Sequence, residues 1–146
     1  MAEVTSSAVS VILPILNEEN YLKQAVAAIL AQDFKGEIEV VLAVGPSKDR
    51  TMQLANQLAN ADARIKVVEN PTGRTATGLN IAIKNSKNPI IVRVDGHANI
   101  PENYISIAVE LLNKTGAVNV GGVMAAEGQT TFEKAVAAAM RSPLGV

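Results

Sequence analysis

The sequence predicts an α/β fold in which a mostly parallel sheet carries helices on both of its faces. Continuous apolar runs, typical of strands buried on both faces, alternate with segments whose apolar residues recur at helical spacing. This alternation favours a parallel sheet with right-handed crossovers. The 146 residues are 48% hydrophobic and 18% charged, which suits one domain with a sizeable core. We expect a flexible N-terminus at residues 1–8 and an α/β domain at residues 9–146.

The first predicted unit is a strand followed by a helix. An apolar run from Val9 to Leu13 is expected to end as a strand at Pro14. Asn17 is the expected N-cap of the helix, which would place Glu18 and Glu19 in the first turn, where the helix dipole favours anions. One apolar stripe completes the unit: Leu22, Ala25, Val26, Ile29 and Leu30.

The next two units repeat this pattern. Residues 38–44 and 65–68 are predicted strands. Ser47, in the turn after the first of them, is expected to cap a helix that begins near Lys48. The apolar stripe of that helix is Thr51, Leu54, Ala55, Leu58 and Ala59. After a loop at residues 70–73, another helix is expected to reach Lys84 with three residues facing inward: Ala76, Leu79 and Ile83.

The last third of the chain begins with a predicted strand at residues 89–94. Pro101 is expected at the first position of the next helix, where its missing N–H costs nothing, and Gly116 is expected to end that helix. The buried stripe of this helix is Ile105, Ala108, Val109 and Leu112. Residues 117–125 predict another strand and residues 132–140 a last helix. Because the chain stops in a loop that contains Pro and Gly, we expect a fragment of a longer domain.

The most chemically suggestive residues follow the strand at residues 89–94. Asp95, Gly96 and His97 come directly after its apolar run, and His97 is the single histidine of the chain. In open α/β sheets, ligands bind just beyond the carboxyl ends of the strands. Asp95 and His97 can point to one side of a ligand, while Gly96 lets the backbone come close. The alternative interpretation is an ordinary turn, with Asp95 capping it and His97 in solvent.

Composition argues against several classes of protein. The net charge is −1, with no basic block and few aromatic residues, so nucleic acid is not an expected partner. The chain has no cysteine, which removes thiolate ligands and nucleophiles and fits a reducing compartment. Residues 1–7 lack signal-peptide features, and no stretch approaches the roughly 20 apolar residues of a membrane helix. We expect a cytoplasmic protein with no membrane segment in this chain.

Two common phosphate-binding signatures are absent from the sequence. No G-x-G-x-x-G follows the first strand, and no G-x-x-x-x-G-K-[ST] occurs. Gly73 and Gly78 have the glycine spacing of the second signature but lack the Lys-Ser/Thr pair after it. Neither a classical dinucleotide site nor a P-loop is therefore predicted.

An ordered set of motifs remains, and it covers the chain from Val9 onward. Its members follow successive strands: Pro14-Ile15-Leu16-Asn17-Glu18, Ser47-Lys48-Asp49-Arg50-Thr51, Asn70 with Gly73 and Asn80, and Asp95-Gly96-His97. The set resembles the family 2 glycosyltransferases, inverting enzymes that carry P-x-x-N-E, D-D-G-S-x-D-x-T, N-x-G…A-R-N-x-G and D-x-D at these places. The tail, with Gly121-Gly122, a helix and residues 142–146, is most similar to the branch of succinoglycan-type exopolysaccharide enzymes.

The resemblance implies a Rossmann-like nucleotide-diphospho-sugar transferase (GT-A) fold. It implies a nucleotide-sugar pocket at Pro14, Asn17, Glu18 and Asp95, and a metal site at Asp95 and His97. Near these we add two candidate contacts to the nucleotide sugar: Arg74, for the diphosphate, and Asn80. The implied partners are a nucleoside-diphosphate sugar, with a UDP-sugar favoured, and a saccharide or lipid-linked acceptor. A full-length protein of this kind would work at the inner face of the membrane.

The chain departs from the family pattern at several places. Val44-Gly45 replaces the paired acids after the second strand, so a usual contact to the base is missing. Leu79 replaces the family's Arg, and Arg74 lies nearby without aligning with it. His97 replaces the last acid of the metal triplet. The catalytic base of the family is expected beyond Val146.

The chemistry of sugar transfer sets the two main hypotheses. The leaving diphosphate must be neutralised, which a divalent cation does as a Lewis acid. Asp95 suits Mg²⁺ or Mn²⁺, and the imidazole of His97 favours Mn²⁺. An inverting transfer also needs a base for the acceptor hydroxyl. The first hypothesis is the donor-binding part of a metal-dependent inverting glycosyltransferase. The second is a non-catalytic nucleotide-binding or interaction domain, and a sugar nucleotidyltransferase is a weaker third.

Other candidate residues have structural alternatives. Residues 17–19 could serve only to start a helix, and Asp49 is interpreted as a charge at a helix N-terminus. Arg74 could be a solvated loop residue, and Asn80 could contact a neighbouring loop. Arg93, inside an apolar strand, is expected to pair with a carboxylate. Because a fragment would leave apolar surface uncovered, we also expect self-association into a homo-oligomer.

Overall fold

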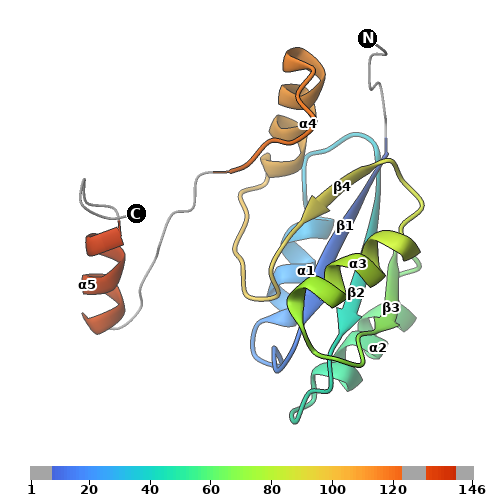
Figure 1. The fold of residues 1–146 in the computed structure, drawn as a ribbon, viewed down its shortest axis with the longest axis vertical. Helices are drawn as coiled ribbons and strands as arrows, with labels where there is room; N and C mark the ends of the chain where they lie inside the picture. The colour runs from blue at the N-terminus through green and yellow to red at the C-terminus, as the bar shows by residue number, and fades with distance from the viewer. Residues whose placement is uncertain (1–7, 123–130, 141–146) are drawn as a thin grey trace.

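The computed structural model describes residues 8–122 and 131–140. The elements in these residues are β1 (Ala8–Ile15), α1 (Leu22–Leu30), β2 (Glu37–Val44), α2 (Thr51–Ala61), β3 (Ile65–Glu69), α3 (Thr75–Asn85), β4 (Ile90–Arg93), α4 (Tyr104–Thr115) and α5 (Thr131–Met140). The four strands form one parallel sheet in the order β3-β2-β1-β4 (Figure 1). The predicted α/β class is therefore confirmed.

Helices pack on both faces of this sheet, as predicted (Figure 1). Alternate residues of the strands face α1, α2 and α4 and form the larger core, whose fully buried side chains include Leu13, Leu22, Ile29, Leu42 and Ile105. The opposite face packs against α3 through a smaller cluster: Ile12, Val41, Ala43 and Ala82. Because β1 and β2 contribute to both clusters, their apolar residues are continuous rather than alternating.

The order of the strands reverses at β1. The chain adds β2 and β3 on one side of β1 and then returns to place β4 on its other side. Such a reversal opens a crevice beyond the carboxyl ends of the two flanking strands, and α/β sheets bind ligands there. In this chain that place lies between the residues after β1 and the residues after β4.

Pro14 lies inside β1, so the prediction that the strand ends at this residue is wrong. β1 pairs with β2 along its whole length, whereas β4 pairs only with Val9–Ile12. The carbonyl of Ile12 accepts a hydrogen bond from the N–H of Val94. Because backbone groups alternate along a strand, the backbone of Pro14 faces β4, as that of Ile12 does, but Pro14 lies beyond the residues that pair with β4. The missing N–H of Pro14 therefore costs no hydrogen bond between β1 and β4.

The starts of α1 and α2 also differ from the prediction. α1 begins at Leu22 without an acidic residue in its first turn, and Asn17, the expected cap, has a left-handed φ of 57°. α2 begins at Thr51 rather than near Lys48, and Ser47 does not cap it. Both predictions are wrong for one reason: Asn17 and Ser47 form hydrogen bonds between their two turns instead of capping helices.

The inward face of α3 is rotated from its predicted position. The residues Gly78 and Ala82 are buried and Leu79 is partly buried, whereas Ala76 and Ile83 are exposed. Small residues let the helix approach the sheet closely, so they form its contact face in place of the larger Ile83.

The chain around α4 confirms the helix but not the position of its proline. α4 begins at Tyr104, whose N–H donates to the carbonyl of Pro101 at 3.1 Å, so Pro101 lies before the helix and not at its first position. Ile105 and Val109 are buried, as predicted. Gly116 ends the helix with a left-handed φ of 65°.

The C-terminal part departs from the prediction in two ways. Residues 117–122 form no strand, and residues 123–125 of the predicted strand lie outside the described residues. β4, predicted as buried on both faces, buries Ile90 and Val92 but exposes Arg93, because it pairs only with β1 in the described sheet. α5 forms as predicted, with Phe132 78% exposed.

Parts of the chain predicted to be terminal segments lie outside the described residues. These are residues 1–7 and residues 141–146. Among the helices at residues 8–122 and 131–140, none has the length and apolar character to span a membrane.

Candidate functional site

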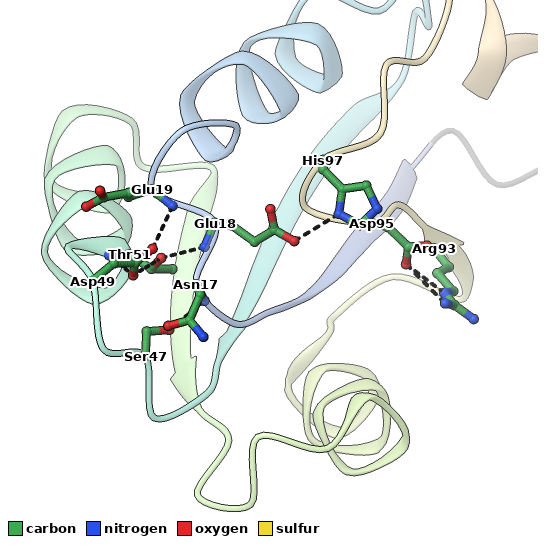
Figure 2. Close-up of polar contacts among 9 residues, drawn as sticks. All are labelled: Asn17, Glu18, Glu19, Ser47, Asp49, Thr51, Arg93, Asp95 and His97. Carbon is green, nitrogen blue, oxygen red and sulfur yellow. Dashed lines mark hydrogen bonds and ion pairs between the residues drawn. The ribbon is translucent and has the colours of Figure 1, made fainter. Parts of the chain in front are cut away.

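The turn after β1 and the turn after β2 are joined by reciprocal hydrogen bonds (Figure 2). The N–H of Asn17 donates to Oγ of Ser47 at 3.0 Å, and Oδ1 of Asn17 accepts from the N–H of Lys48 at 2.8 Å. The left-handed backbone of Asn17, which asparagine tolerates better than most residues, allows both bonds. Asn17 is therefore a structural link between the two turns.

A second link runs from the same turn to the start of α2. Oγ1 of Thr51 accepts from the N–H of Glu18 at 2.7 Å, and Oδ2 of Asp49 accepts from the N–H of Glu19 at 3.2 Å. Oδ1 of Asp49 accepts from the N–H of Thr51, the first residue of α2, at 2.9 Å, so its charge lies at the N-terminus of this helix, as interpreted from the sequence. The hydroxyl of Thr51 also donates to Asp49, and this bond lowers the pKa of Asp49 below its ordinary value of 3.8.

Glu18 reaches from the end of β1 to the turn after β4. Its Oε1 lies 2.9 Å from Nδ1 of His97 (Figure 2). The side chain of Glu18 is only 15% exposed, whereas that of His97 is 64% exposed. The pair therefore lies beyond the carboxyl ends of β1 and β4, with its carboxylate largely buried and its imidazole toward solvent.

Gly96 is buried between these two side chains and β1. An added Cβ would lie 2.8 Å from Cγ2 of Ile15 and 3.0 Å from Cγ of Glu18. No side chain fits in that space, so the glycine allows the turn after β4 to approach the end of β1. The sequence predicts a close backbone approach at Gly96, and in the structure this glycine lies against Ile15 and Glu18.

Asp95 is held by the last residue of β4. Its Oδ1 accepts from Nε of Arg93 at 3.1 Å and from Nη2 at 3.0 Å, which confirms the carboxylate partner expected for Arg93. Asp95 remains 45% exposed at its side chain. Its carbonyl accepts from the N–H of Ala98 at 2.9 Å, which closes the turn that carries His97.

The loop after β3 forms another side of this edge. Asn70 is 2% exposed, its N–H donates to the carbonyl of Val44, and its Nδ2 donates to the carbonyl of Arg74 at 3.1 Å. A Cβ added at Gly78 would lie 2.8 Å from Nδ2 of Asn70. Asn70 therefore fixes the start of α3 against the sheet, a role that the sequence pattern alone does not reveal.

Three residues predicted for the nucleotide pocket lie away from the Glu18–His97 contact. Pro14 is half-buried on β1, 3.2 Å from the position of a Cβ added at Gly78 of α3. Arg74 precedes α3 at the edge where β3 ends, and its side chain is exposed. Asn80 is exposed further along α3. The structure thus brings Glu18 and His97 into contact, holds Asp95 in the same turn as His97 with its carboxylate on Arg93, and leaves these three on the α3 side.

Two side chains at this edge, those of Asp95 and His97, carry donor atoms of the kind that bind divalent cations. Within residues 8–122 and 131–140, no cluster of three or more His, Cys, Asp or Glu side chains could hold a metal ion by itself. Asp95 and His97 nevertheless offer one hard oxygen and one imidazole nitrogen from a single exposed turn. Protein sites for Mg²⁺ often combine one or two carboxylates with substrate phosphates, and imidazole is a better ligand for Mn²⁺.

The comparison with protein families decides the assignment. The model described as glycosyl transferase family 2 matches residues 10–143. The chain belongs to this family. Among curated relatives of this family 2 chain, the succinoglycan biosynthesis protein ExoA of Rhizobium meliloti (strain 1021) is 31% identical over 145 residues, which are 98% of this chain and 44% of ExoA.

Solved glycosyltransferases share the fold of this family 2 chain. S. aureus TarS is 26% identical with a TM-score of 0.66, over 82% of this chain and 23% of TarS. The mannosyltransferase PcManGT from Pyrobaculum calidifontis is 29% identical with a TM-score of 0.63, over 71% of this chain and 32% of PcManGT. The expected GT-A fold is confirmed, and the chain spans less than half the length of each of these three relatives.

Proposed function

We propose that this chain binds a nucleoside-diphosphate sugar and a divalent cation at the crevice between β1 and β4, for inverting transfer of the sugar to an acceptor. The observation that carries the proposal is the contact of Glu18 with His97 at the carboxyl ends of the two strands that flank the reversal, with Asp95 in the same turn as His97. α/β sheets bind ligands at such a place. The structure of PcManGT in complex with GDP-Man and Mn²⁺ supports this class of donor and metal.

Different residues would bind the cation and the diphosphate. A bound cation supplies Lewis-acid neutralisation of the leaving diphosphate. Asp95 and His97 would hold that cation, and Arg93 orients the carboxylate of Asp95 through two donors on one oxygen. Arg74, at the same edge of the sheet, would contact the diphosphate, and Glu18 would lie beside the donor.

The remaining pocket assignments follow from position on the sheet. Pro14 and Asn80 lie on the α3 side of the crevice and would flank the nucleotide, while Asn17 would hold the turn that carries Glu18. We favour a uridine nucleotide and a saccharide or lipid-linked acceptor, with the reaction in the cytoplasm. The name of the relative ExoA supports a role in exopolysaccharide synthesis, and the absence of cysteine suits a reducing compartment.

A second candidate function is nucleotide binding without transfer. It is favoured by Gly45, where the resembled family has an acid after the second strand. A Cβ at Gly45 would lie 3.0 Å from both Cα of Gly73 and Cδ1 of Leu16, so this turn has no room for an acidic side chain. The donor base would then lose that carboxylate contact, and binding would depend more on the diphosphate and the cation.

Calorimetric titration with UDP and with GDP, in the presence and absence of Mn²⁺, tests the proposal. We expect binding that requires Mn²⁺, is lost in Asp95→Ala and persists in Glu102→Ala, which removes an exposed carboxylate from the same connection. Binding that is independent of both Mn²⁺ and Asp95 would contradict it. Appearance of the sugar on the acceptor, together with release of the nucleoside diphosphate, separates transfer from the second candidate.

A further inference from the structure

We propose that Glu18 is a positioning residue that sets the tautomer of His97 and directs its Nε2 toward the cation. The inference rests on the proposed function, because it assumes that His97 is a metal ligand. It adds a role for Glu18 that a contact with the nucleotide sugar would not require.

The geometry of the pair determines which nitrogen carries the proton. Oε1 of Glu18 lies 2.9 Å from Nδ1 of His97. An ionised carboxylate only accepts hydrogen bonds, so Nδ1 must donate, and the lone pair of the neutral ring is then on Nε2. Nε2 lies on the far side of the ring, and the side chain of His97 is 64% exposed. Histidines that bind metals commonly donate their second N–H to a carboxylate in this way.

Glu18 is itself held in place by the turns after β1 and β2. Its backbone N–H donates to Oγ1 of Thr51 at 2.7 Å, and Thr51 donates its own N–H to Asp49 at 2.9 Å. The side chain is only 15% exposed and packs against Gly96, whose added Cβ would lie 3.0 Å from Cγ of Glu18. A carboxylate restricted in this manner loses little further entropy when it orients a neighbour.

The same contact makes residue 97 dependent on residue 18. A carboxylate at position 97 would face the carboxylate of Glu18 where the imidazole now donates a hydrogen bond to it, and two like charges at that distance repel. The imidazole therefore matches Glu18 in this chain. We expect His97→Asp to weaken Mn²⁺ binding, and Glu18→Gln to restore part of the loss in the double variant.

Imidazole ¹⁵N spectroscopy measures the tautomer directly and needs neither donor nor acceptor. Because His97 is the single histidine, its two nitrogen signals are unambiguous. At alkaline pH we expect the Nδ1–H tautomer in the wild-type chain and a shift toward Nε2–H, the form that a solvated imidazole prefers, in Glu18→Ala. Glu19→Ala is the matched control, because Glu19 is adjacent but pairs with Arg50.

Electron paramagnetic resonance of free Mn²⁺ gives the second readout, with and without UDP. We expect the affinity for Mn²⁺ to fall about 10- to 100-fold in Glu18→Ala, less in Glu18→Gln, and not in Glu19→Ala. Circular dichroism checks that each variant is folded, and Glu18→Gln keeps an acceptor for Nδ1–H if Glu18→Ala does not fold.

The outcomes separate this inference from the proposed function. An unchanged tautomer in Glu18→Ala overturns the positioning role, even if Mn²⁺ and UDP still bind together. A rise in Mn²⁺ affinity also overturns it, because Glu18 would then compete with the cation for His97. A changed tautomer in Glu18→Ala, with a wild-type chain that binds Mn²⁺ but no nucleotide, supports the positioning role and contradicts the proposed function.

Discussion

Nδ1 of His97 lies 2.9 Å from Oε1 of Glu18, although the two residues are 79 positions apart in the sequence. The contact crosses the one place where the strand order reverses, since Glu18 follows β1 and His97 follows β4. Two polar segments that are unremarkable by themselves thus become a single site.

Replacing Gly96 should disturb the contact between Glu18 and His97. In Gly96→Ala the new Cβ would lie 2.8 Å from Cγ2 of Ile15, and overpacking of this kind costs about 1–3 kcal/mol of unfolding free energy. Urea denaturation measures this cost. Gly121→Ala is the control, because an added Cβ there has nothing within 4 Å. Equal stability of the two variants would contradict the close approach that we assign to Gly96.

Gln32 should hold the segment between β4 and α4, which carries the site, against the end of α1. Its Nε2 donates to the carbonyl of Pro101 at 2.7 Å, and its Oε1 accepts from the N–H of Ile105 at 2.9 Å in the first turn of α4. Gln32→Ala leaves both backbone groups without this partner, which we expect to cost about 1–3 kcal/mol of unfolding free energy. Denaturation with urea, and hydrogen exchange at residues 98–105, measure the effect.

A matched glutamine on α1, the helix that Gln32 follows, provides the control. Gln24 is exposed on α1, so Gln24→Ala should leave stability nearly unchanged. If Gln32→Ala is also neutral, or if hydrogen exchange is unchanged at residues 98–105, the connection is held by other contacts.

The two wrong predictions about helix caps share a physical cause. Asn17 and Ser47 have the composition of helix caps, and a local pattern assigns them to the helices that follow. In the folded chain the N–H of Asn17 donates to Ser47, 30 positions away. The next two backbone N–H groups, those of Glu18 and Glu19, donate to the side chains of Thr51 and Asp49. Sequence periodicity identifies which segments form helices, but it does not contain the contacts between turns that determine where each helix begins.

The location of the candidate site at the end of β4 was predictable from the sequence. The position of Asp95 and His97 after an apolar strand follows from strand topology alone, and the structure confirms that location. The partnership of His97 with Glu18 was not predictable, because it depends on which strands become neighbours. Asn80 is exposed because the small residues Gly78 and Ala82 form the buried face of α3, and Arg74 lies directly before this helix.

Acid should remove the stabilising effect of Asp49. The hydroxyl of Thr51 lowers the pKa of Asp49 below 3.8, so the folded chain binds this proton less tightly than the unfolded chain. The stabilisation is therefore fully present above the unfolded value and is lost as the pH falls through the lower folded value. The difference in unfolding free energy between wild type and Asp49→Asn should shrink in that acidic range. A difference that grows toward acid would contradict this sign.

Exposed apolar side chains on α4 should promote self-association. Ile107 is 45% exposed and Leu111 is 41% exposed, one helical turn apart, and Val118 is fully exposed nearby in the sequence. Light scattering across a concentration series should show a rising mass for the wild-type chain. The double variant Ile107→Ser and Leu111→Ser should lower that mass, and a wild-type monomer at every concentration would contradict the prediction.

The most direct measurement is paramagnetic broadening of backbone amide signals by Mn²⁺ in the presence of UDP, with Mg²⁺ as the diamagnetic reference. The account predicts the strongest broadening at residues 17–18 and 96–98, on the two sides of the crevice, and little at residues 87–88, which precede β4 at the opposite edge of the sheet. Broadening centred on residues 87–88, or spread evenly over the chain, would contradict a cation site at Asp95 and His97.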